Sequence, residues 1–288
     1  MNTNTECFEV EIDGRVGHIK LNRPEKRNSM IRSFWRDLPR LVQDLDADGS
    51  VRAIVVSSTG PHFTSGMDVS VFGGSGEAPT AMDQRRRGAK FYENVLHLQK
   101  SFNAFEEARV PVLAAIQGGC IGGGVDLATA CDMRYATQDA FFTIFETNIG
   151  MTADVGTFPR ISKLIPDGVA RELAYTGRRM GAEEAMSFGL VNRVFDDQEK
   201  LLEGVFEIAH EIARKAPLTI YGCKRMMLHA RDHRVADTLD YISIWNASML
   251  QGEEIMEAMQ ANREKREGEF ADLPQRPAHE ESSAVQDN

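Results

Sequence analysis

The stretch GGCIGGGVDLATACD, residues 118–132, organises this sequence. It follows an apolar run, residues 110–116, that predicts a buried strand, and it leads into residues 125–131, which predict a short helix. Five of the seven residues from 118 to 124 are glycine, and they occupy the passage from strand to helix. Glycine costs backbone entropy, which chains tolerate where φ is positive or where another group must approach the main chain.

This passage predicts a site for an oxygen that gains negative charge. A helix start presents unpaired N–H groups and the positive end of the helix dipole, and both favour an anion. Asp126, in the first turn, would project a carboxylate into the same space. The structural alternative is that the glycines only allow tight packing and that Asp126 only favours the helix N-terminus. Neither G-x-G-x-x-G nor G-x-x-x-x-G-K-[ST] occurs between residues 118 and 124, so the pattern does not indicate a phosphate-binding loop.

The composition is that of an ordinary globular protein of one large or two modest cores, with 288 residues, 42% of them hydrophobic and 26% charged. A formal net charge of −10 argues against nucleic acid or an anionic membrane as a partner. The seven histidines form no metal-binding motif, and no run is long enough for a transmembrane helix. We therefore expect no metal site and no membrane partner.

The cysteines and the ends of the sequence predict a cytoplasmic protein. The acidic start resembles neither a signal nor a transit peptide, and the end lacks the S-K-L peroxisomal address. None of the cysteines belongs to a C-x-x-C pair. Scattered cysteines of this kind are typical of reduced thiols. They are Cys7, Cys120, Cys131 and Cys223.

Before the glycine-rich passage, the pattern alternates strands and helices. Residues 8–21 alternate apolar and polar side chains on both sides of Asp13-Gly14, which predicts a hairpin. A helix is expected over 30–45 and a buried strand over 53–57. In the loop 60–70, Gly66 follows small polar residues, so the backbone N–H of Met67 is free to be a second oxyanion donor. A flexible loop over 73–79 and a long helix over 83–108 follow.

After the passage, two acids stand in an apolar and small-residue context. Glu146 and Asp154 lie in the segment 145–161, which follows short strand candidates at 133–135 and 140–144. An acid in such surroundings is a candidate for a perturbed pKa and a functional role. The structural alternatives are a helix N-cap for Asp154 and a surface loop position for Glu146.

From residue 166 onward helical patterns dominate, and the tail from residue 271 lacks periodicity and is predicted to be mobile. Because strands come first and helices later, with repeated strand-strand-helix units, a simple doubly wound order is not expected. The predicted helices cover residues 168–175, 182–188, 197–215, 218–231 and 235–265.

Four segments, in order and at matching spacings, resemble the crotonase (enoyl-CoA hydratase/isomerase) superfamily over roughly residues 8–264. They are LNRPEKRNSM (21–30), HFTSGMDV (62–69), AAIQGGCIGGGVDLATACD (114–132) and MSFGLVNRV (186–194). The resemblance implies an α/β fold, a spiral of repeated ββα units over residues 1–200, and a C-terminal helical trimerisation region over 201–270, with 271–288 as the tail. It also implies an acyl-CoA thioester ligand and a homotrimer or dimer of trimers. The N–H groups of Met67 and Gly123 would form the oxyanion hole, and CoA would be part of the substrate, with no separate cofactor.

The acids are most similar to those of the dienoyl-CoA isomerase branch, which moves a 3,5-diene into 2,4 conjugation in unsaturated fatty acid β-oxidation. Hydratases of the family carry glutamate at the positions matched by Asp126 and Glu146. Here the first is aspartate, and a third acid, Asp154, follows the second by eight residues. The surrounding text TADVGTFPR (152–160) and the later YISIWNASMLQ (241–251) also resemble that branch.

The chemistry requires acids at two places. A proton on carbon 2 of a thioester becomes removable when fixed donors hold the developing enolate oxygen, and one donor contributes about 3 kcal/mol. In a dienolate the charge extends to carbon 6, so a second acid must deliver a proton there. The resemblance assigns carbon 2 to Glu146, and Asp154 would then serve carbon 6; the reverse assignment stays open. Asp126 would be an auxiliary acid that tunes the other two.

Two alternatives remain open at this stage. The first is an enoyl-CoA hydratase, although Asp126 is one methylene shorter than the usual acid. The second is an acyl-CoA-binding subunit without catalysis, whose acids serve as caps. The sequence does not decide the acyl chain length of the substrate, the choice between trimer and hexamer, or the CoA contacts. The three arginines at 85–87 are candidates for binding the CoA phosphates by charge alone.

Overall fold

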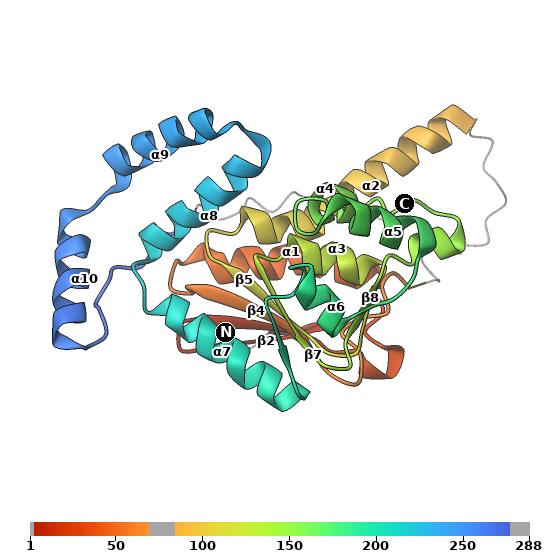
Figure 1. Cartoon of the computed structure of the whole chain (residues 1–288), viewed down its shortest axis with the longest axis horizontal. Coiled ribbons are helices and arrows are strands. Elements are labelled where there is room, and N and C mark those ends of the chain that lie inside the picture. Colours follow the sequence, from red (N-terminus) through yellow and green to blue (C-terminus); the bar gives the residue numbers. More distant parts are fainter. Residues whose placement is uncertain (1–2, 69–83, 277–288) are drawn as a thin grey trace.

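The computed structural model describes residues 3–68 and 84–276, which form two sheets and the helices around them (Figure 1). The larger sheet has the order β1-β2-β3-β4-β5-β7-β10 and the smaller one the order β6-β8-β9. The strands of the larger sheet are β1 (Thr3–Asn4), β2 (Phe8–Asp13), β3 (Val16–Leu21), β4 (Ala53–Ser58), β5 (Val112–Ile116), β7 (Met133–Thr137) and β10 (Arg193–Phe195). Those of the smaller sheet are β6 (Gly119–Ile121), β8 (Phe141–Thr143) and β9 (Met180–Gly181).

Helices cover most of the remaining described chain. In order they are η1 (Pro24–Lys26), α1 (Arg32–Ala47), α2 (Gln84–Glu107), α3 (Gly123–Ala130), η3 (Glu146–Ile149), α4 (Thr157–Ile161), α5 (Asp167–Thr176), α6 (Ala182–Ser187), α7 (Gln198–Ala213), α8 (Pro217–Asp232), α9 (Val235–Met249) and α10 (Gly252–Glu264).

The larger sheet begins with the predicted hairpin and then becomes parallel. β2 and β3 pair antiparallel across Asp13-Gly14, and Gly14 has a φ of +59°, which glycine adopts without steric cost. From β3 through β4, β5, β7 and β10 every pair is parallel. Parallel strands need crossover connections, and α1, α2 and α3 lie in those between β3, β4, β5 and β7.

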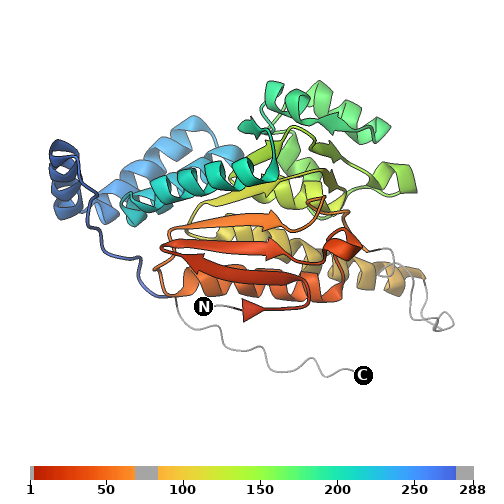
Figure 2. The same cartoon turned by 90° about the horizontal axis from the view of Figure 1, so that it is seen from below.

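Helices bury both faces of the parallel strands. Along β4, Ile54 and Val56 pack with the core on one side, while Ala53 and Val55 pack with residues of α7 on the other. Figures 1 and 2 show α7 lying along one face, with α1, α2 and α3 on the opposite face. A strand covered on both faces reads as a continuous apolar run rather than an alternating one, which explains why the run over 53–57 predicts a buried strand.

The chain repeats a ββα unit, as the sequence predicts. A long strand joins the larger sheet, a short strand follows in the smaller sheet, and a helix returns; β5-β6-α3 is the clearest case. In the unit that starts with β4, the second strand is reduced to a bridge in which Thr64 pairs parallel with Cys120 of β6. The short strands therefore lie side by side, in the order Thr64, β6, β8.

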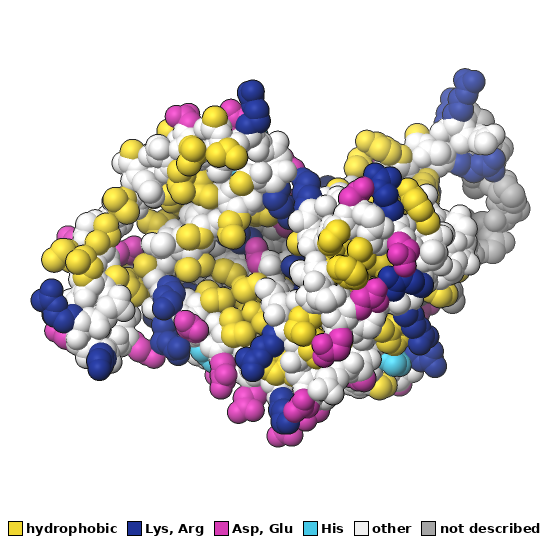
Figure 3. All heavy atoms as spheres, viewed as in Figure 1, with side chains coloured by type: hydrophobic (Ala, Val, Ile, Leu, Met, Phe, Trp, Pro, Cys, Tyr) yellow, Lys and Arg dark blue, Asp and Glu magenta, His cyan; other side chains and the backbone are white. Residues whose placement is uncertain are grey.

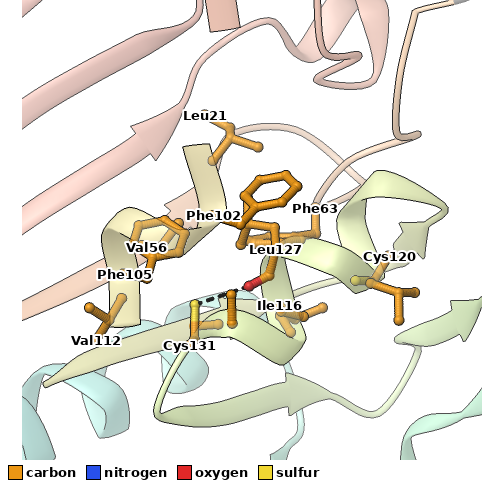
Figure 4. Packing of buried hydrophobic residues seen from close by; sticks show 14 of the residues in the cluster. Leu21, Val56, Phe63, Phe102, Phe105, Val112, Ile116, Cys120, Leu127 and Cys131 are labelled. Carbon is orange, nitrogen blue, oxygen red and sulfur yellow. Dashed lines mark hydrogen bonds between the residues drawn. The ribbon is translucent and has the colours of Figure 1, made fainter. Parts of the chain in front are cut away.

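The glycine-rich passage runs into the centre of the core. Leu127 of α3 is fully buried among Phe63, Phe102 and Ile116, and the Cys131 thiol contacts the Leu127 carbonyl oxygen at 3.4 Å (Figure 4). All eight residues of α3 are buried. Because close packing in the core fixes the helix, its N-terminus is held in one position.

The C-terminal region differs from prediction at two places. The predicted helix 197–215 is α7, which covers the sheet, and the helices that extend from the body start with α8 (Figure 1). The predicted helix 235–265 is two helices, because Leu250 and Gln251 have extended dihedrals. The tail predicted to be mobile from residue 271 packs as far as residue 276: Leu273 is buried and the Arg276 N–H donates to the Ala47 carbonyl.

Candidate active site

The parallel register of the short strands brings three separate segments together. Thr64 pairs with Cys120, and Cys120 pairs with Phe142 of β8. Residues a few positions beyond such partners leave the strands at the same edge. Met67 follows Thr64, Gly123 follows Cys120, and Glu146 follows Phe142, so equivalent points of successive units supply the site.

The backbone amides of Met67 and Gly123, the two oxyanion donors that the family resemblance implies, lie next to each other. A β-carbon on Gly66 would stand 3.2 Å from the Gly123 nitrogen, and one on Gly123 would stand 3.7 Å from the Met67 nitrogen. The Met30 N–H donates to the Gly66 carbonyl and the Asp68 N–H to the Met30 carbonyl, so the Met67 N–H points away from Met30. Within the described residues neither amide donates a backbone hydrogen bond, as an oxyanion donor requires.

Glycines keep this space open. Gly66 has a φ of +81°, and a β-carbon there would stand 2.6 Å from the Ile121 carbonyl oxygen. Gly122 has a φ of +53°, and a β-carbon on Gly124 would stand 2.6 Å from Thr64. The glycines that the sequence concentrates between residues 118 and 124 therefore serve both expected uses: Gly122 has a positive φ, and Gly124 allows the close approach of Thr64.

Glu146 lies against Gly122, the residue before the Gly123 amide. It opens η3 directly after the smaller sheet, and its Oε1 would stand 3.1 Å from a β-carbon on Gly122. Its Oε2 is buried without a hydrogen-bond partner among the described residues. Burial, and then the negative charges of Asp126 and Asp154, raise the pKa of Glu146 to about 7. A surface loop acid does not have these properties, so that alternative is wrong.

Asp126 is almost completely buried, at 1% exposure, on the first turn of α3. Its Oδ1 accepts hydrogen bonds from the Thr157 backbone N–H at 2.6 Å and from the Thr157 hydroxyl at 2.8 Å. Burial raises the pKa of Asp126 to about 6, although both Thr157 bonds and the charge of Arg160 oppose the rise. Asp126 thus caps α4 rather than only its own helix.

Asp154 lies half-buried in the loop before α4. Its carbonyl oxygen accepts a hydrogen bond from the Gln99 side chain of α2 at 2.7 Å, and burial raises the pKa of its carboxyl. The N-cap of α4 is Gly156, without a side-chain cap bond. The structural alternative for Asp154, a helix N-cap, is therefore wrong. Its charge acts on both Asp126 and Glu146, so the structure brings the three predicted acids into one cluster.

Other sequence candidates lie outside this cluster. His62 Nδ1 accepts from the Gly119 N–H at 3.0 Å and its ring stacks edge-on with Phe141, which is a structural role. The arginines at 85–87 lie exposed on the first turn of α2. The loop predicted over 73–79 lies outside the described residues.

The residues that hold the acids in place are not among those predicted from the sequence. Thr157 fixes Asp126, and Gln99 fixes the backbone of Asp154. Arg160, 7% exposed, binds Asn103 and Glu106 of α2, both at 2.7 Å. A buried arginine needs a partner. The sequence feature that could have indicated Arg160 is its place in the apolar segment 145–161, which also holds the two acids.

Among residues 3–68 and 84–276, no three or more His, Cys, Asp or Glu side chains are grouped so that they could hold a metal ion. In the same part of the chain, no helix is long and apolar enough to cross a membrane.

Comparison with known proteins gives one family and a consistent group of relatives. The family model "Enoyl-CoA hydratase/isomerase" matches residues 11–274. The mitochondrial Delta(3,5)-Delta(2,4)-dienoyl-CoA isomerase of Mus musculus is 45% identical over 266 residues, which are 92% of this chain and 81% of the relative. The peroxisomal Delta(3,5)-Delta(2,4)-dienoyl-CoA isomerase of Arabidopsis thaliana is 38% identical, over 93% of this chain and 97% of the relative.

Among solved structures, the enoyl-CoA hydratase from Bacillus anthracis superposes with a TM-score of 0.83 at 27% identity. The match covers 92% of this chain and 99% of that one. The similarity therefore extends over the sheets, the site and most of the helical region.

Proposed function

This chain belongs to the enoyl-CoA hydratase/isomerase family, and we propose how its three acids and two amides carry out the isomerisation of a dienoyl-CoA. The enzyme shifts the double bonds of a 3,5-dienoyl-CoA into the conjugated 2,4 positions, as part of unsaturated fatty acid oxidation. The reaction moves protons only, so CoA enters as part of the substrate and no separate cofactor is needed.

The Met67 and Gly123 amides would hold the thioester oxygen. When a base removes a proton from carbon 2, negative charge grows on this oxygen. Two free N–H groups fixed by the core and by the smaller sheet stabilise that charge without reorganisation. Their position next to each other supports this role.

Glu146 would act at carbon 2, and the observation that carries the proposal is its carboxylate beside Gly122, whose Oε2 is buried without a hydrogen-bond partner among the described residues. Carbon 2 is bonded to the carbonyl carbon whose oxygen would lie on the amides, and Glu146 lies against Gly122, directly before one of them. A base whose pKa is near the working pH transfers protons efficiently, and a positioned carboxylate contributes on the order of 10² to 10⁴ in rate. The pKa of about 7 fits this task.

Asp154 would deliver the proton to carbon 6. It is held by a different segment from Glu146, in the loop before α4, and so can reach the far end of the diene. Burial already raises the pKa of its carboxyl, and an apolar acyl chain would remove more water from it. The neutral, proton-donating form is favoured by both effects.

The two alternatives are now weaker. A hydratase must place water between two acids, whereas here Asp126 is committed to Thr157. A subunit without catalysis would use its acids as caps, but the buried Oε2 of Glu146 has no hydrogen-bond partner among the described residues.

The decisive experiment compares wild type, E146Q and D154N with 3,5-octadienoyl-CoA in deuterium oxide. Growth of 2,4-dienoyl absorbance reports isomerisation, and mass spectrometry reports exchange at carbon 2. We expect D154N to lose several powers of ten in isomerisation while it still exchanges the carbon 2 hydrogen, and E146Q to lose both. Loss of exchange in D154N with retention in E146Q would reverse the assignment, and an inert wild type that hydrates crotonyl-CoA would overturn the proposal.

The assembly that we propose is a homotrimer or dimer of trimers. The helices α8, α9 and α10 enclose an apolar groove of about 740 Å³ and expose many large apolar side chains (Figure 3). Leu239, Leu250 and Met256 are 60%, 61% and 66% exposed, and patches of this kind mark protein interfaces.

The cytoplasmic location predicted from the cysteines stays a proposal. The named relatives are mitochondrial in Mus musculus and peroxisomal in Arabidopsis thaliana. Fluorescence microscopy of the full chain with organelle markers tests it.

A further inference from the structure

Thr157, the first residue of α4, gives both of its donors to a single oxygen of Asp126. The backbone N–H lies 2.6 Å from Oδ1 and the hydroxyl 2.8 Å from the same atom. Both residues are 1% exposed, so water has little access to either bond. Two donors on one buried carboxyl oxygen stabilise its charged form.

Four other titratable groups act on Asp126 or are acted on by it. Arg160 of α4 favours the charged form of Asp126, and Asp154 disfavours it. The charge of Asp126 in turn raises the pKa of Glu146 and that of the buried Cys120 thiol. Burial and the charge of Asp154 raise the pKa of Asp126, and only Thr157 and Arg160 lower it. Of these two residues, Thr157 is the one that contacts Asp126 directly.

Arg160 is itself held by a glycine and by α2. Gly156 has a φ of +134°, and a β-carbon there would stand 1.9 Å from an Arg160 nitrogen. Asn103 and Glu106 bind the other side of the guanidinium. The start of α4 is thus fixed, and Thr157 with it.

We propose that Thr157 is the positioning residue that holds Asp126 as a fixed anion and so leaves the transferable protons of the site to Glu146 and Asp154. The catalytic part of this inference rests on the proposed function. In each turnover Glu146 gains the proton from carbon 2, Asp154 gives its proton to carbon 6, and Asp126 begins and ends as a carboxylate. Proton exchange with water after product release returns Glu146 to its carboxylate form and Asp154 to its neutral form. The negative charge of Asp126 at the working pH makes Glu146 the stronger base.

The first test needs no substrate. Infrared difference spectra over a pH series report the protonated carboxyl band, and its absence in D126N assigns it to Asp126. In Thr157→Val, which keeps the shape and the N–H but loses the hydroxyl, we expect Asp126 to retain its proton to a pH higher by on the order of one unit. Thr157→Ser, which keeps the hydroxyl, should restore the wild-type titration.

The second test is the pH profile of kcat/KM with the dienoyl substrate. A neutral Asp126 no longer opposes ionisation of Glu146, so in Thr157→Val the acidic limb should move to lower pH and the maximum rate should fall. Thr157→Ser should reverse both changes. If Thr157 had a purely structural role, Thr157→Val would have a lower rate and an acidic limb at the wild-type pH. That result would overturn the proposal.

A second variant distinguishes a failure to fold from a failure of the proposal. If the valine variant does not fold, Thr157→Cys supplies a weak donor of similar size and the same shifts are expected. A folded variant whose Asp126 band titrates as in wild type overturns the inference. If the band shifts while wild type is inert towards dienoyl substrates, the fixed anion is upheld and the proposed function fails instead.

Discussion

The carboxylate of Glu146 lies against the main chain of Gly122: a β-carbon on Gly122 would stand 3.1 Å from Oε1 and 3.9 Å from Oε2. Gly122 immediately precedes the Gly123 amide and has φ +53° and ψ −116°, which side chains rarely adopt. The same glycine therefore shapes the helix start and leaves room for the acid.

Substitution of Gly122 by alanine should reduce isomerase activity by on the order of 10² or more, because the methyl group displaces the carboxylate. Strain should also cost about 1 to 3 kcal/mol in the free energy of unfolding. Gly14→Ala is the matched control, since Gly14 has φ +59° with nothing within 4 Å. It should lower stability by about 1 kcal/mol with unchanged kcat/KM. Equal activity losses in the two variants would show that contact with Glu146 is unimportant.

Replacement of Glu146 by glutamine should remove activity and stabilise the fold above neutral pH. The pKa of Glu146 is raised from 4.5 to about 7, so the folded state loses stability as pH rises between these values. The glutamine variant escapes this loss. Its melting temperature should match wild type below pH 4.5 and exceed it by a few degrees above pH 7. Calorimetry at the two pH values checks this, and an unchanged or lower value at pH 8 would contradict it.

The pH dependence of wild-type kcat/KM should have an acidic limb near the pKa of Glu146, about 7. Activity rises with pH there because the base must be ionised to accept the carbon 2 proton. The limb belongs to the coupled acids rather than to one residue. A steady-state pH series measures it, and a limb near 4.5 would mean that burial and neighbouring charges do not act on the base.

A charge on the exposed apolar face of the C-terminal helices should break the assembly. Met256→Glu places a carboxylate on a residue that is 66% exposed, which is costly inside an interface. We expect light scattering to show a smaller species than wild type. Glu203→Lys on α7, an exposed position on another surface, is the control and should keep the wild-type mass. Dissociation by the control alone would place the interface elsewhere.

Local patterns predicted much of the fold. The apolar run 110–116, the hairpin at Asp13-Gly14 and the helix from the glycine-rich passage depend on nearby residues, and all three are present. The family resemblance, carried by four spaced motifs, is confirmed by the family match. The break at Leu250 escaped prediction, although Gly252 marked it, because helical periodicity continues through it.

The contacts of the site could not be derived in the same way. The pairing of Thr64 with Cys120, and of Cys120 with Phe142, is set by the whole sheet rather than by neighbours along the chain. The bond from Thr157 to Asp126 joins residues 31 positions apart. The acids of the site could thus be predicted from the sequence. The residues that bind those acids and change their pKa could be identified only from the folded structure.

The hydrogen bonds between Asp126 and α4 also restrict which acid this position of α3 can hold. A glutamate in place of Asp126 would carry its carboxylate one methylene farther from the backbone of α3, away from the position that the Thr157 donors meet. The buried donors at the start of α4 would then be left unsatisfied. An exchange of Asp126 for glutamate is therefore expected to cost stability unless the start of α4 changes with it.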